Sequence, residues 1–321
     1  MMVSVSTSRP VISRSIQTSF PSPGLSSLIA PRIHANGFTM PRRMQTQGTC
    51  MASDPTVISA AELASRLAQG EDLLVVQVTS RQVYDAAHIE GSHCVEPAEL
   101  VSGVPPATGR LPDAERLARL FGRLRLAEDR QVVTLDDEGG GWAGRLAWTL
   151  DVLGRRDWIY LDGGLHAWHQ SGLPLVSGPP PPSDSTTGVR VTVDRAPIAE
   201  AEDILERLDD RTLTVWDCRS WEEYTGQRVA AARAGHIPGA VHLDWLELMQ
   251  RDRGLRLIDD IAGLLARRGI GPEQDVIAHC QTHHRSGLAY MVARLLGFPR
   301  IRAYHGSWAE WGNRPDTPVE T

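Results

Sequence analysis

The amino-acid sequence predicts an α/β protein with two similar domains, each a mainly parallel sheet with helices on both faces. Three observations support this fold class. The chain has 321 residues, a length that favours two domains over one. Short apolar runs alternate with amphipathic stretches through short connections, an order typical of parallel sheets with crossover helices. The same order of elements then occurs again in the second half of the chain.

Landmark residues recur at a nearly constant separation, which indicates an internal repeat. Three pairs are 143 residues apart: Gly154 and Gly297, Gly163 and Gly306, and Trp168 and Trp311. The turn His-Ile-Glu-Gly at residues 88–91 recurs 148 residues later as His-Ile-Pro-Gly at residues 236–239. Four landmarks that agree in order and spacing predict two copies of one domain.

The first domain is predicted to span residues 54–176. It opens with a helix whose start has the pattern of a capping box, Ser59 followed three residues later by Glu62. Apolar runs predict buried strands at residues 73–78, 131–135 and 158–161. Amphipathic stretches between them predict helices at residues 112–126 and 142–153.

The second domain is predicted to span residues 189–321. It follows residues 177–188, whose four consecutive prolines predict a stiff, exposed linker. The pattern of the first domain then repeats, with strands predicted at residues 213–217, 276–279 and 301–304. Helices are predicted at residues 199–208, at 258–268, and from Leu288 to Gly297.

Charge and cysteine content exclude several classes of protein. The formal net charge of -6 argues against a nucleic-acid or membrane-surface role. No apolar run approaches the ~18–20 residues that span a bilayer. The four cysteines, Cys50, Cys94, Cys218 and Cys280, form no Cys-x-x-Cys pair. We therefore expect free thiols in a reducing compartment, which favours a cytoplasmic location.

Residues 1–53 differ from the rest of the chain, because they contain no Asp or Glu, many Ser and five Arg. We expect a disordered N-terminal extension, and two origins for it stay open. A transit peptide would place the protein in an organelle. A start position set too far upstream would fit the methionines just before residue 54. The absence of lysine indicates a GC-rich, bacterial genome and favours the second origin.

Residues 275–287 have the features of a reactive cysteine site. An apolar run ends at Cys280, Arg285 follows five residues later, and a helical pattern begins at Leu288. The free N–H groups and the dipole of a helix N-terminus favour an anion. We expect the pKa of the Cys280 thiol to be lowered, so that the thiol is partly ionised at neutral pH. Cys94 and Cys218 are expected to be ordinary buried thiols.

The repeat places Asp137 at the position in the first domain that corresponds to Cys280, 143 residues earlier. A carboxylate is stable at a helix N-terminus but cannot accept a sulfur atom. We therefore expect the first domain to lack a nucleophile and to serve as a structural partner. The chain is predicted to have one active site.

Three segments of the second half resemble motifs of a known family. They are residues 235–240 (Gly-His-Ile-Pro-Gly-Ala), the strand, cysteine loop and helix around Cys280, and residues 304–312 (Tyr-His-Gly-Ser-Trp-Ala-Glu-Trp-Gly). With them, residues 56–320 resemble the tandem-domain rhodanese family, the thiosulfate and 3-mercaptopyruvate sulfurtransferases. The resemblance implies the same fold, with an inactive first domain and an active second one.

The resemblance also implies a two-step reaction without a metal or an organic cofactor. The Cys280 thiolate takes the outer sulfur of a small donor such as thiosulfate and becomes a persulfide. An acceptor, which is cyanide, a thiol or a protein, then removes this sulfur. Nucleic acid and membrane are not expected as partners.

Site residues follow from the resemblance and from their chemistry. Cys280 is the expected nucleophile, and Arg285 is the expected fixed cation of the loop. The residues expected to surround the donor are Gln281, Thr282, His283, His284, Arg285 and Arg233. Asp217 and Arg219 are expected to support the loop from the end of a strand. Adjacent histidines in a tight loop point in different directions, so no metal site is expected at residues 283–284.

Donor and function have alternatives. Glu223 stands where mercaptopyruvate enzymes of this family place an arginine, and it would repel a carboxylate, which favours thiosulfate. 3-Mercaptopyruvate remains the alternative donor. A persulfide carrier or redox-sensing module would use the same residues. A Cdc25-like phosphatase or arsenate reductase shares the fold, but its loop has five residues between Cys and Arg, whereas four separate Cys280 from Arg285.

Overall fold

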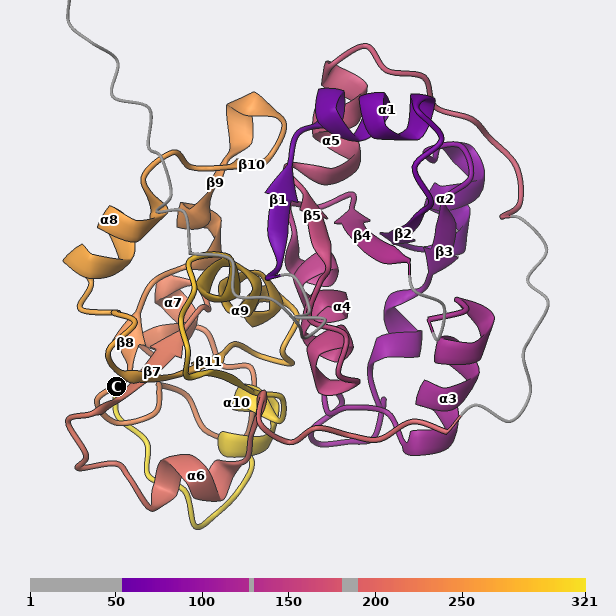
Figure 1. Cartoon of the computed structure of the whole chain (residues 1–321). Coiled ribbons are helices and arrows are strands. Elements are labelled where there is room, and N and C mark those ends of the chain that lie inside the picture. Colours follow the sequence, from indigo (N-terminus) through magenta and orange to yellow (C-terminus); the bar gives the residue numbers. More distant parts are fainter. Residues whose placement is uncertain (1–53, 127–129, 181–189) are drawn as a thin grey trace, which may run out of the picture. The chain divides into compact units, whose positions relative to one another are not determined.

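The computed structural model describes residues 54–126, 130–180 and 190–321 (Figure 1). The N-terminal extension predicted for residues 1–53 and most of the predicted linker lie outside these residues. The described chain forms two five-stranded sheets, in the orders β1-β5-β4-β2-β3 and β6-β12-β11-β7-β8. All neighbouring strands within each of these sheets are parallel. The predicted α/β class with two similar domains is confirmed.

The two sheets use their strands in the same way. The first sheet contains β1 (Thr56–Ile58), β2 (Leu73–Val78), β3 (His93–Val95), β4 (Gln131–Asp136) and β5 (Ile159–Leu161). The second contains β6 (Ile198–Ala199), β7 (Leu213–Asp217), β8 (Val241–His242), β11 (Asp275–His279) and β12 (Ile301–Tyr304). A separate antiparallel pair is formed by β9 (Met249–Gln250) and β10 (Arg256–Leu257).

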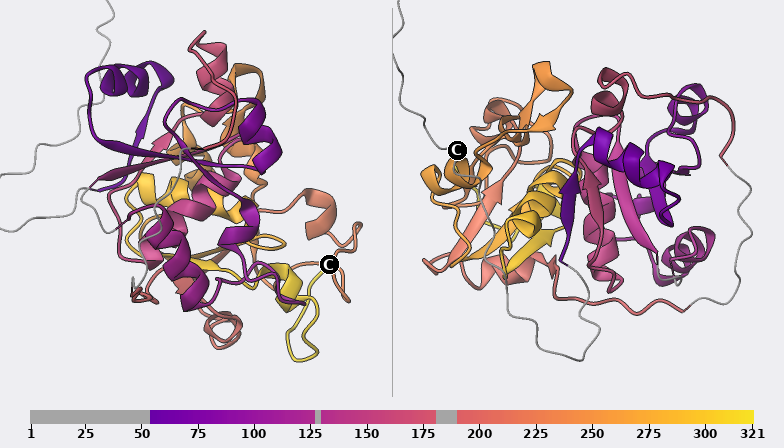
Figure 2. Two further views of the ribbon diagram at one scale, coloured as in Figure 1. Left: turned by 90° about the vertical axis from the view of Figure 1, so that its right-hand side faces the viewer. Right: turned by 45° about the horizontal axis from the view of Figure 1, so that its top comes forward.

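Helices cover both faces of the sheets, as Figure 2 shows. In the first half they are α1 (Ala60–Ala68), α2 (Arg81–Ala86), α3 (Ala114–Arg123), α4 (Gly141–Val152) and α5 (Gly164–Gln170). In the second half they are α6 (Ala201–Leu205), α7 (Trp221–Tyr224), α8 (Ile261–Arg267), α9 (Arg285–Leu295) and α10 (Ser307–Trp311). Single 3-10 turns are η1 (Pro97–Leu100), η2 (Trp245–Leu248) and η3 (Arg251–Arg253). No helix among the described residues is long and apolar enough to cross a membrane.

Long elements agree with the sequence prediction, and the short ones were not foreseen. Strands β1, β3, β6 and β8 have two or three residues each, too few to show a periodic pattern. Helix α9 begins at Arg285, three residues before the predicted start, because Arg285 and Ser286 already have helical geometry. At α1, Ser59 accepts the N–H of Glu62, whereas the Glu62 carboxylate binds Arg66.

The internal repeat is visible in the two turns that carry its histidines. His88 stacks on Tyr84 with ring centroids 3.9 Å apart, and its Nδ1 lies 2.8 Å from the Tyr84 carbonyl oxygen. His236 stacks on Tyr224 at 3.7 Å, and its Nδ1 also lies 2.8 Å from the carbonyl oxygen of its tyrosine. Each histidine also forms an isolated antiparallel bridge with the end of its own domain. The same local structure at both positions supports two copies of one domain.

Helices α4 and α9 form the centre of the molecule and pack against each other, as Figure 1 shows. Their buried side chains belong to one apolar cluster that includes residues of both sheets. Ten consecutive residues of α4 and eight of α9 are buried, so neither helix has a polar face. Two further clusters lie on the outer faces of the two sheets. The core therefore unites both domains through this helix pair.

Two glycines make this close packing possible. A Cβ built on Gly287 would lie 2.6 Å from the backbone nitrogen of Arg145 and 2.6 Å from the carbonyl oxygen of Gly141. A Cβ built on Gly144 would overlap the backbone of Gly287. Because backbone atoms cannot move away as the end of a side chain can, only glycine allows the two helices to approach so closely.

Gly144→Ala should therefore destabilise the protein, although alanine is the better helix former. Overpacking of this kind costs about 1–3 kcal/mol, more than the roughly 1 kcal/mol that alanine gains in a helix. Urea unfolding would measure the change in the free energy of unfolding. An increase in stability would show that the helices can separate without loss.

Candidate functional site

Cys280 lies at the carboxyl end of β11, completely buried, and its backbone is held by α10. Its N–H donates to the hydroxyl of Ser307 at 3.3 Å, and its carbonyl oxygen accepts the N–H of Trp308 at 3.0 Å. The carbonyl oxygen of Gln281 accepts the N–H of Ala309 at 3.0 Å. The start of the loop is thus fixed by the first turn of α10, the motif after β12.

The surroundings of the Cys280 sulfur favour its ionised form. Burial disfavours the thiolate, but the Arg285 guanidinium, the N–H and hydroxyl of Ser286, and His284 together outweigh burial. The pKa of Cys280 is therefore lowered, as the sequence predicts. The other described cysteines show the opposite: burial raises the pKa of Cys94 to about 11 and that of Cys218 well above its ordinary value. Both are buried, as expected.

Arg285 is paired with Glu223 in a two-pronged ion pair. Its two terminal nitrogens donate to the two carboxylate oxygens of Glu223, at 2.6 and 3.0 Å. Glu223 is 4% exposed, so the pair is shielded from water. Burial opposes ionisation of both groups, yet the ion pair lowers the pKa of Glu223 and raises that of Arg285. The sequence analysis treated Glu223 only as an obstacle to a carboxylate donor, whereas it orients the cation of the loop.

Two other loop residues, Gln281 and Thr282, contact different parts of the chain. The amide nitrogen of Gln281 donates to the carbonyl oxygen of Ala230 at 2.8 Å, within the second domain. The backbone of Thr282 lies against Gly109 of the first domain, so closely that a Cβ at Gly109 would overlap it. The loop therefore rests on the first domain at its second residue.

His283 is buried between the loop and the first domain. Its backbone has a positive φ of 55°, which turns the ring inward. Its Nδ1 lies 2.8 Å from the Ser286 hydroxyl oxygen, and its ring meets the edge of Trp148 of α4 at 4.6 Å. Burial, followed by the charge of Arg145, lowers its pKa well below the ordinary value, so the ring is neutral.

His284 also contacts the first domain. Its Nε2 binds the Glu138 carboxylate, and its ring stacks on Trp142 with centroids 4.4 Å apart. Gly141 leaves room for it, since a Cβ there would lie 2.5 Å from Nε2. The prediction that Thr282, His283 and His284 surround the donor does not match these contacts. A single sequence does not show that a loop faces a domain more than 130 residues away.

Arg233 does not lie free for a substrate. Its guanidinium donates to the carbonyl oxygen of Trp311 at 2.7 Å and to those of Gly312, Arg314 and Thr317. It therefore fastens the C-terminal segment to the turn before His236. The expectation of a substrate-binding arginine at this position is at odds with these contacts, because its donors are already used.

Asp217 and Arg219 form a buried ion pair, with Arg219 Nη2 and Asp217 Oδ2 2.6 Å apart. Arg219 also lies 4.3 Å from the ring centre of Trp308 and donates to the carbonyl oxygen of Gly235 at 2.8 Å. Asp217 Oδ2 lies 3.6 Å from Nε2 of His279, whose Nδ1 is 3.2 Å from the carbonyl oxygen of Cys280. Burial lowers the pKa of His279 to about 4, so its ring is neutral. The pair thus contacts the loop only through His279 and Trp308.

The corresponding loop of the first domain is filled by a carboxylate, but by that of Asp136 instead of Asp137. Asp136 Oδ1 accepts three backbone N–H groups of the loop, at 2.8 to 3.2 Å, and Oδ2 accepts two from the start of α4, at 2.9 and 3.0 Å. Asp137 aligns with Cys280 in sequence, yet its contact is a backbone one, to His166. The prediction named the wrong aspartate because spacing cannot tell which of two adjacent side chains turns inward.

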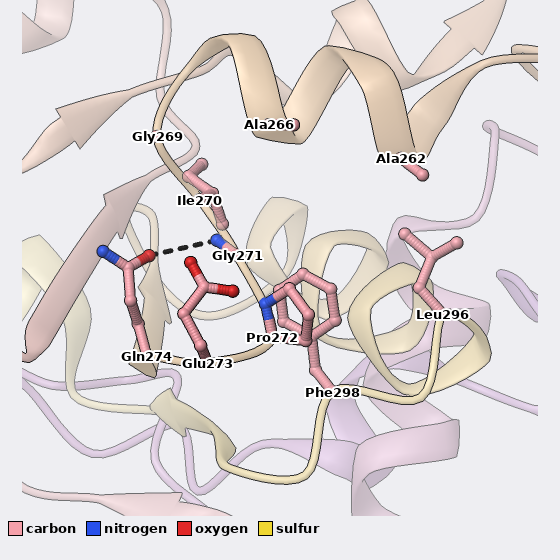
Figure 3. A pocket seen from close by; sticks show the side chains of 10 residues that line it. All are labelled: Ala262, Ala266, Gly269, Ile270, Gly271, Pro272, Glu273, Gln274, Leu296 and Phe298. Atoms are coloured by element: carbon pink, nitrogen blue, oxygen red, sulfur yellow. Dashed lines mark hydrogen bonds between the residues drawn. The ribbon is translucent and has the colours of Figure 1, made fainter.

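A separate pocket lies away from the cysteine, as Figure 3 shows. It is lined by the end of α8, the turn at residues 269–274 and two residues after α9, Leu296 and Phe298. This turn leads into β11, and Cys280 follows the other end of the same strand. The pocket therefore lies at the opposite edge of the sheet from the reactive thiol.

Comparison with known proteins now adds to this geometry. The family model described as "Rhodanese-like domain" matches residues 59–171 and 200–314. The chain belongs to the rhodanese family. The family resemblance drawn from the motifs is thereby confirmed, and so is the tandem arrangement. Both loops, the one around Asp136 and the one around Cys280, lie within the matched segments.

Relatives of this chain cover nearly its whole described length. It is 47% identical to a thiosulfate sulfurtransferase of Azotobacter vinelandii, over 84% of this chain and 98% of that protein. It is 46% identical to a thiosulfate sulfurtransferase of Pseudomonas aeruginosa, over 83% of this chain and 97% of that protein. A solved structure of an anaerobic ergothioneine biosynthesis enzyme from Chlorobium limicola has a TM-score of 0.71 at 23% identity, covering 83% of this chain and 70% of that one. That likeness supports the fold alone.

The charge of Arg285 can be tested by comparing Glu223→Gln with the double variant Glu223→Gln/Arg285→Gln. The double variant avoids leaving a buried carboxylate without its partner, which would by itself destabilise the fold. Because Arg285 lowers the pKa of Cys280, the double variant should need a higher pH for half-maximal alkylation by iodoacetamide, by roughly one unit. Equal alkylation profiles in the two variants would remove Arg285 as the cause of the lowered pKa.

Proposed function

We propose that this protein is a sulfurtransferase that moves a sulfane sulfur from thiosulfate to a thiophilic acceptor, with Cys280 as the nucleophile. The observation that carries the proposal is a buried thiol of lowered pKa at the carboxyl end of β11, faced by Arg285 and Ser286. The two thiosulfate sulfurtransferases aligned along nearly their full lengths support the same activity. A thiolate is the nucleophilic form of cysteine, so the electrostatics favour attack at neutral pH.

In the first half-reaction the Cys280 thiolate attacks the outer sulfur of thiosulfate. A sulfur–sulfur bond forms to Cys280, the sulfur–sulfur bond of the donor breaks, and sulfite leaves with that electron pair. The persulfide keeps a negative charge on its outer sulfur, where Arg285 and the Ser286 donors can stabilise it. In the second half-reaction the acceptor attacks this outer sulfur, and Cys280 leaves as the thiolate. With cyanide as acceptor neither step transfers a proton.

The ion pair with Glu223 supports thiosulfate over 3-mercaptopyruvate as donor. A guanidinium that binds a substrate carboxylate side by side uses two parallel N–H groups. In Arg285 two such groups are already bonded to Glu223. A carboxylate donor would have to displace a buried glutamate, at a cost of several kcal/mol for leaving that charge unpaired. The remaining donors close to the sulfur, the N–H and hydroxyl of Ser286, suit a single anionic sulfur.

The acceptor and the location are proposed from less specific features. Cyanide serves as the test acceptor, and a small thiol or a protein thiol is the acceptor class that the persulfide chemistry allows. The three described cysteines are free, which supports a reducing, cytoplasmic location. A persulfide carrier would use the same Cys280, but it would not discharge its sulfur to small acceptors.

Thiocyanate formation from thiosulfate and cyanide tests the proposal. Wild-type protein should form thiocyanate, and Cys280→Ser should lose this activity by about 10³-fold or more, because an alcohol is not ionised at neutral pH. Cys94→Ser serves as the control for a buried thiol outside the site and should keep the activity. After incubation with thiosulfate alone, the intact mass should increase by one sulfur atom in wild type and not in Cys280→Ser.

Two results would contradict the proposal. If neither thiosulfate nor 3-mercaptopyruvate gives thiocyanate, the transferase reading fails. If a stable persulfide forms on Cys280 but cyanide and small thiols leave it intact, the carrier reading replaces the enzyme.

A further inference from the structure

Arg145, in the second turn of α4, is a buried cation that forms no ion pair with any residue the structure describes. It is completely buried, and its terminal nitrogens donate to the carbonyl oxygens of Gly109 at 2.8 Å and Leu100 at 2.6 Å. Its Nε has no hydrogen-bond partner. Burial lowers its pKa to about 9, which still leaves it charged at neutral pH. A buried charge without a counterion is costly, so its presence calls for a reason.

The surroundings of Arg145 lead directly to the cysteine loop. Its guanidinium lies 4.6 Å from the ring centre of Trp148, and the His283 ring meets the same indole at 4.6 Å. His305 lies 5.6 Å from that indole. The Nε2 atoms of His283 and His305 are buried without a partner, as is Nε of Arg145. Three cationic or potentially cationic groups thus surround one aromatic ring beneath the loop.

The position of one proton on His283 decides what Ser286 can do. Its Nδ1 lies 2.8 Å from the Ser286 hydroxyl oxygen, and the Ser286 hydroxyl also contacts the Cys280 sulfur. If Nδ1 carries the proton, it donates to Ser286, and the hydroxyl proton is free to bond the thiolate. If Nε2 carries the proton, Ser286 must donate to Nδ1 and cannot donate to the sulfur.

The charge of Arg145 favours the first arrangement. A neighbouring cation disfavours the imidazolium form and stabilises a ring nitrogen that offers a lone pair. Nδ1 is already occupied by Ser286, so Nε2 is the nitrogen left to remain unprotonated. Other charges near His283 are those of His305 and His284. The charges that act on Cys280 are Arg285 and His284 from the loop and α9, and Arg145 and Cys218 from outside them.

We propose that Arg145, supplied by the domain without a nucleophile, is a positioning residue of the catalytic centre that acts through His283 and Ser286 on the sulfur of Cys280. It also holds the backbone of Gly109, on which the Thr282 backbone rests. The inference deepens the proposed function, since it concerns the same cysteine. It assigns the first domain an electrostatic part in sulfur transfer in addition to its packing.

The test measures the rate of Cys280 alkylation by iodoacetamide against pH on the full chain, with the modified residue identified by mass spectrometry. Arg145→Met should raise the pH of half-maximal alkylation by about one unit, which means roughly tenfold less thiolate at a given lower pH. Ser286→Ala should raise it similarly. The double variant should shift no further than the larger single shift, because both changes remove the same hydrogen bond.

Three further variants separate positioning from mere structural support. Arg145→Lys keeps the charge and should recover at least half of the shift. His283→Asn should keep a low midpoint, because asparagine tolerates the positive φ of 55° and its amide can donate where Nδ1 does. Arg155→Met is the matched control, since Arg155 also binds backbone carbonyl oxygens, those of Leu126 and Arg130, but beyond the other end of α4. It should leave the midpoint unchanged.

Several outcomes would overturn the proposal. An unchanged midpoint in Arg145→Met, even with reduced thiocyanate formation, would make Arg145 a structural clamp only. Additive shifts in the double variant would show that Arg145 does not act through Ser286. If Arg145→Met does not fold, a midpoint in His283→Asn as high as in Ser286→Ala would reject the hydrogen-bond chain. Alkylation needs no sulfur donor, so a protein without transferase activity would refute the proposed function and still allow this test.

Discussion

The contact between α4 and α9 is the constraint on which the rest of the structure depends. The two helices cross at Gly144 and Gly287, where backbone meets backbone without an intervening side chain. Each helix begins at the loop that follows a central strand of its own sheet, β4 or β11. Bringing the helices together therefore brings the two loops together. The cysteine loop is completed by the other domain because this crossing leaves no space for water between them.

This arrangement resolves a conflict at Cys280. Complete burial disfavours a charged sulfur, yet the reaction requires a thiolate. The protein offsets burial with fixed donors and cations, Arg285 and Ser286 from α9 and Arg145 from α4. Glu223 in turn fixes Arg285, and the charge on Arg145 has only carbonyl oxygens as direct partners. The field at the sulfur thus comes from both halves of the chain.

The sequence was sufficient for features that depend on local pattern. The strands β2, β4, β7 and β11, the helices after both loops, the repeat and the position of Cys280 were all predicted correctly. What could not be predicted depends on contacts between distant segments. Nothing local shows that His283 and His284 turn toward Trp148 and Glu138, or that Arg233 binds the carbonyl oxygens of the C-terminal segment. The inward turn of Asp136 in place of Asp137 depends on a single rotation of the backbone, below what residue spacing can resolve.

The contacts of the cysteine loop bear on how far this fold is modular. Duplication of a domain usually suggests that each copy could work alone and that the idle copy could be lost. Here three consecutive loop residues have their partners in the idle copy, at Gly109, Trp148 and Glu138. Separating the halves would leave a histidine, a stacking face and a glycine contact without their counterparts. The smallest working unit of this protein is consequently the pair, and the copy that gave up its cysteine is held in place by the one that kept it.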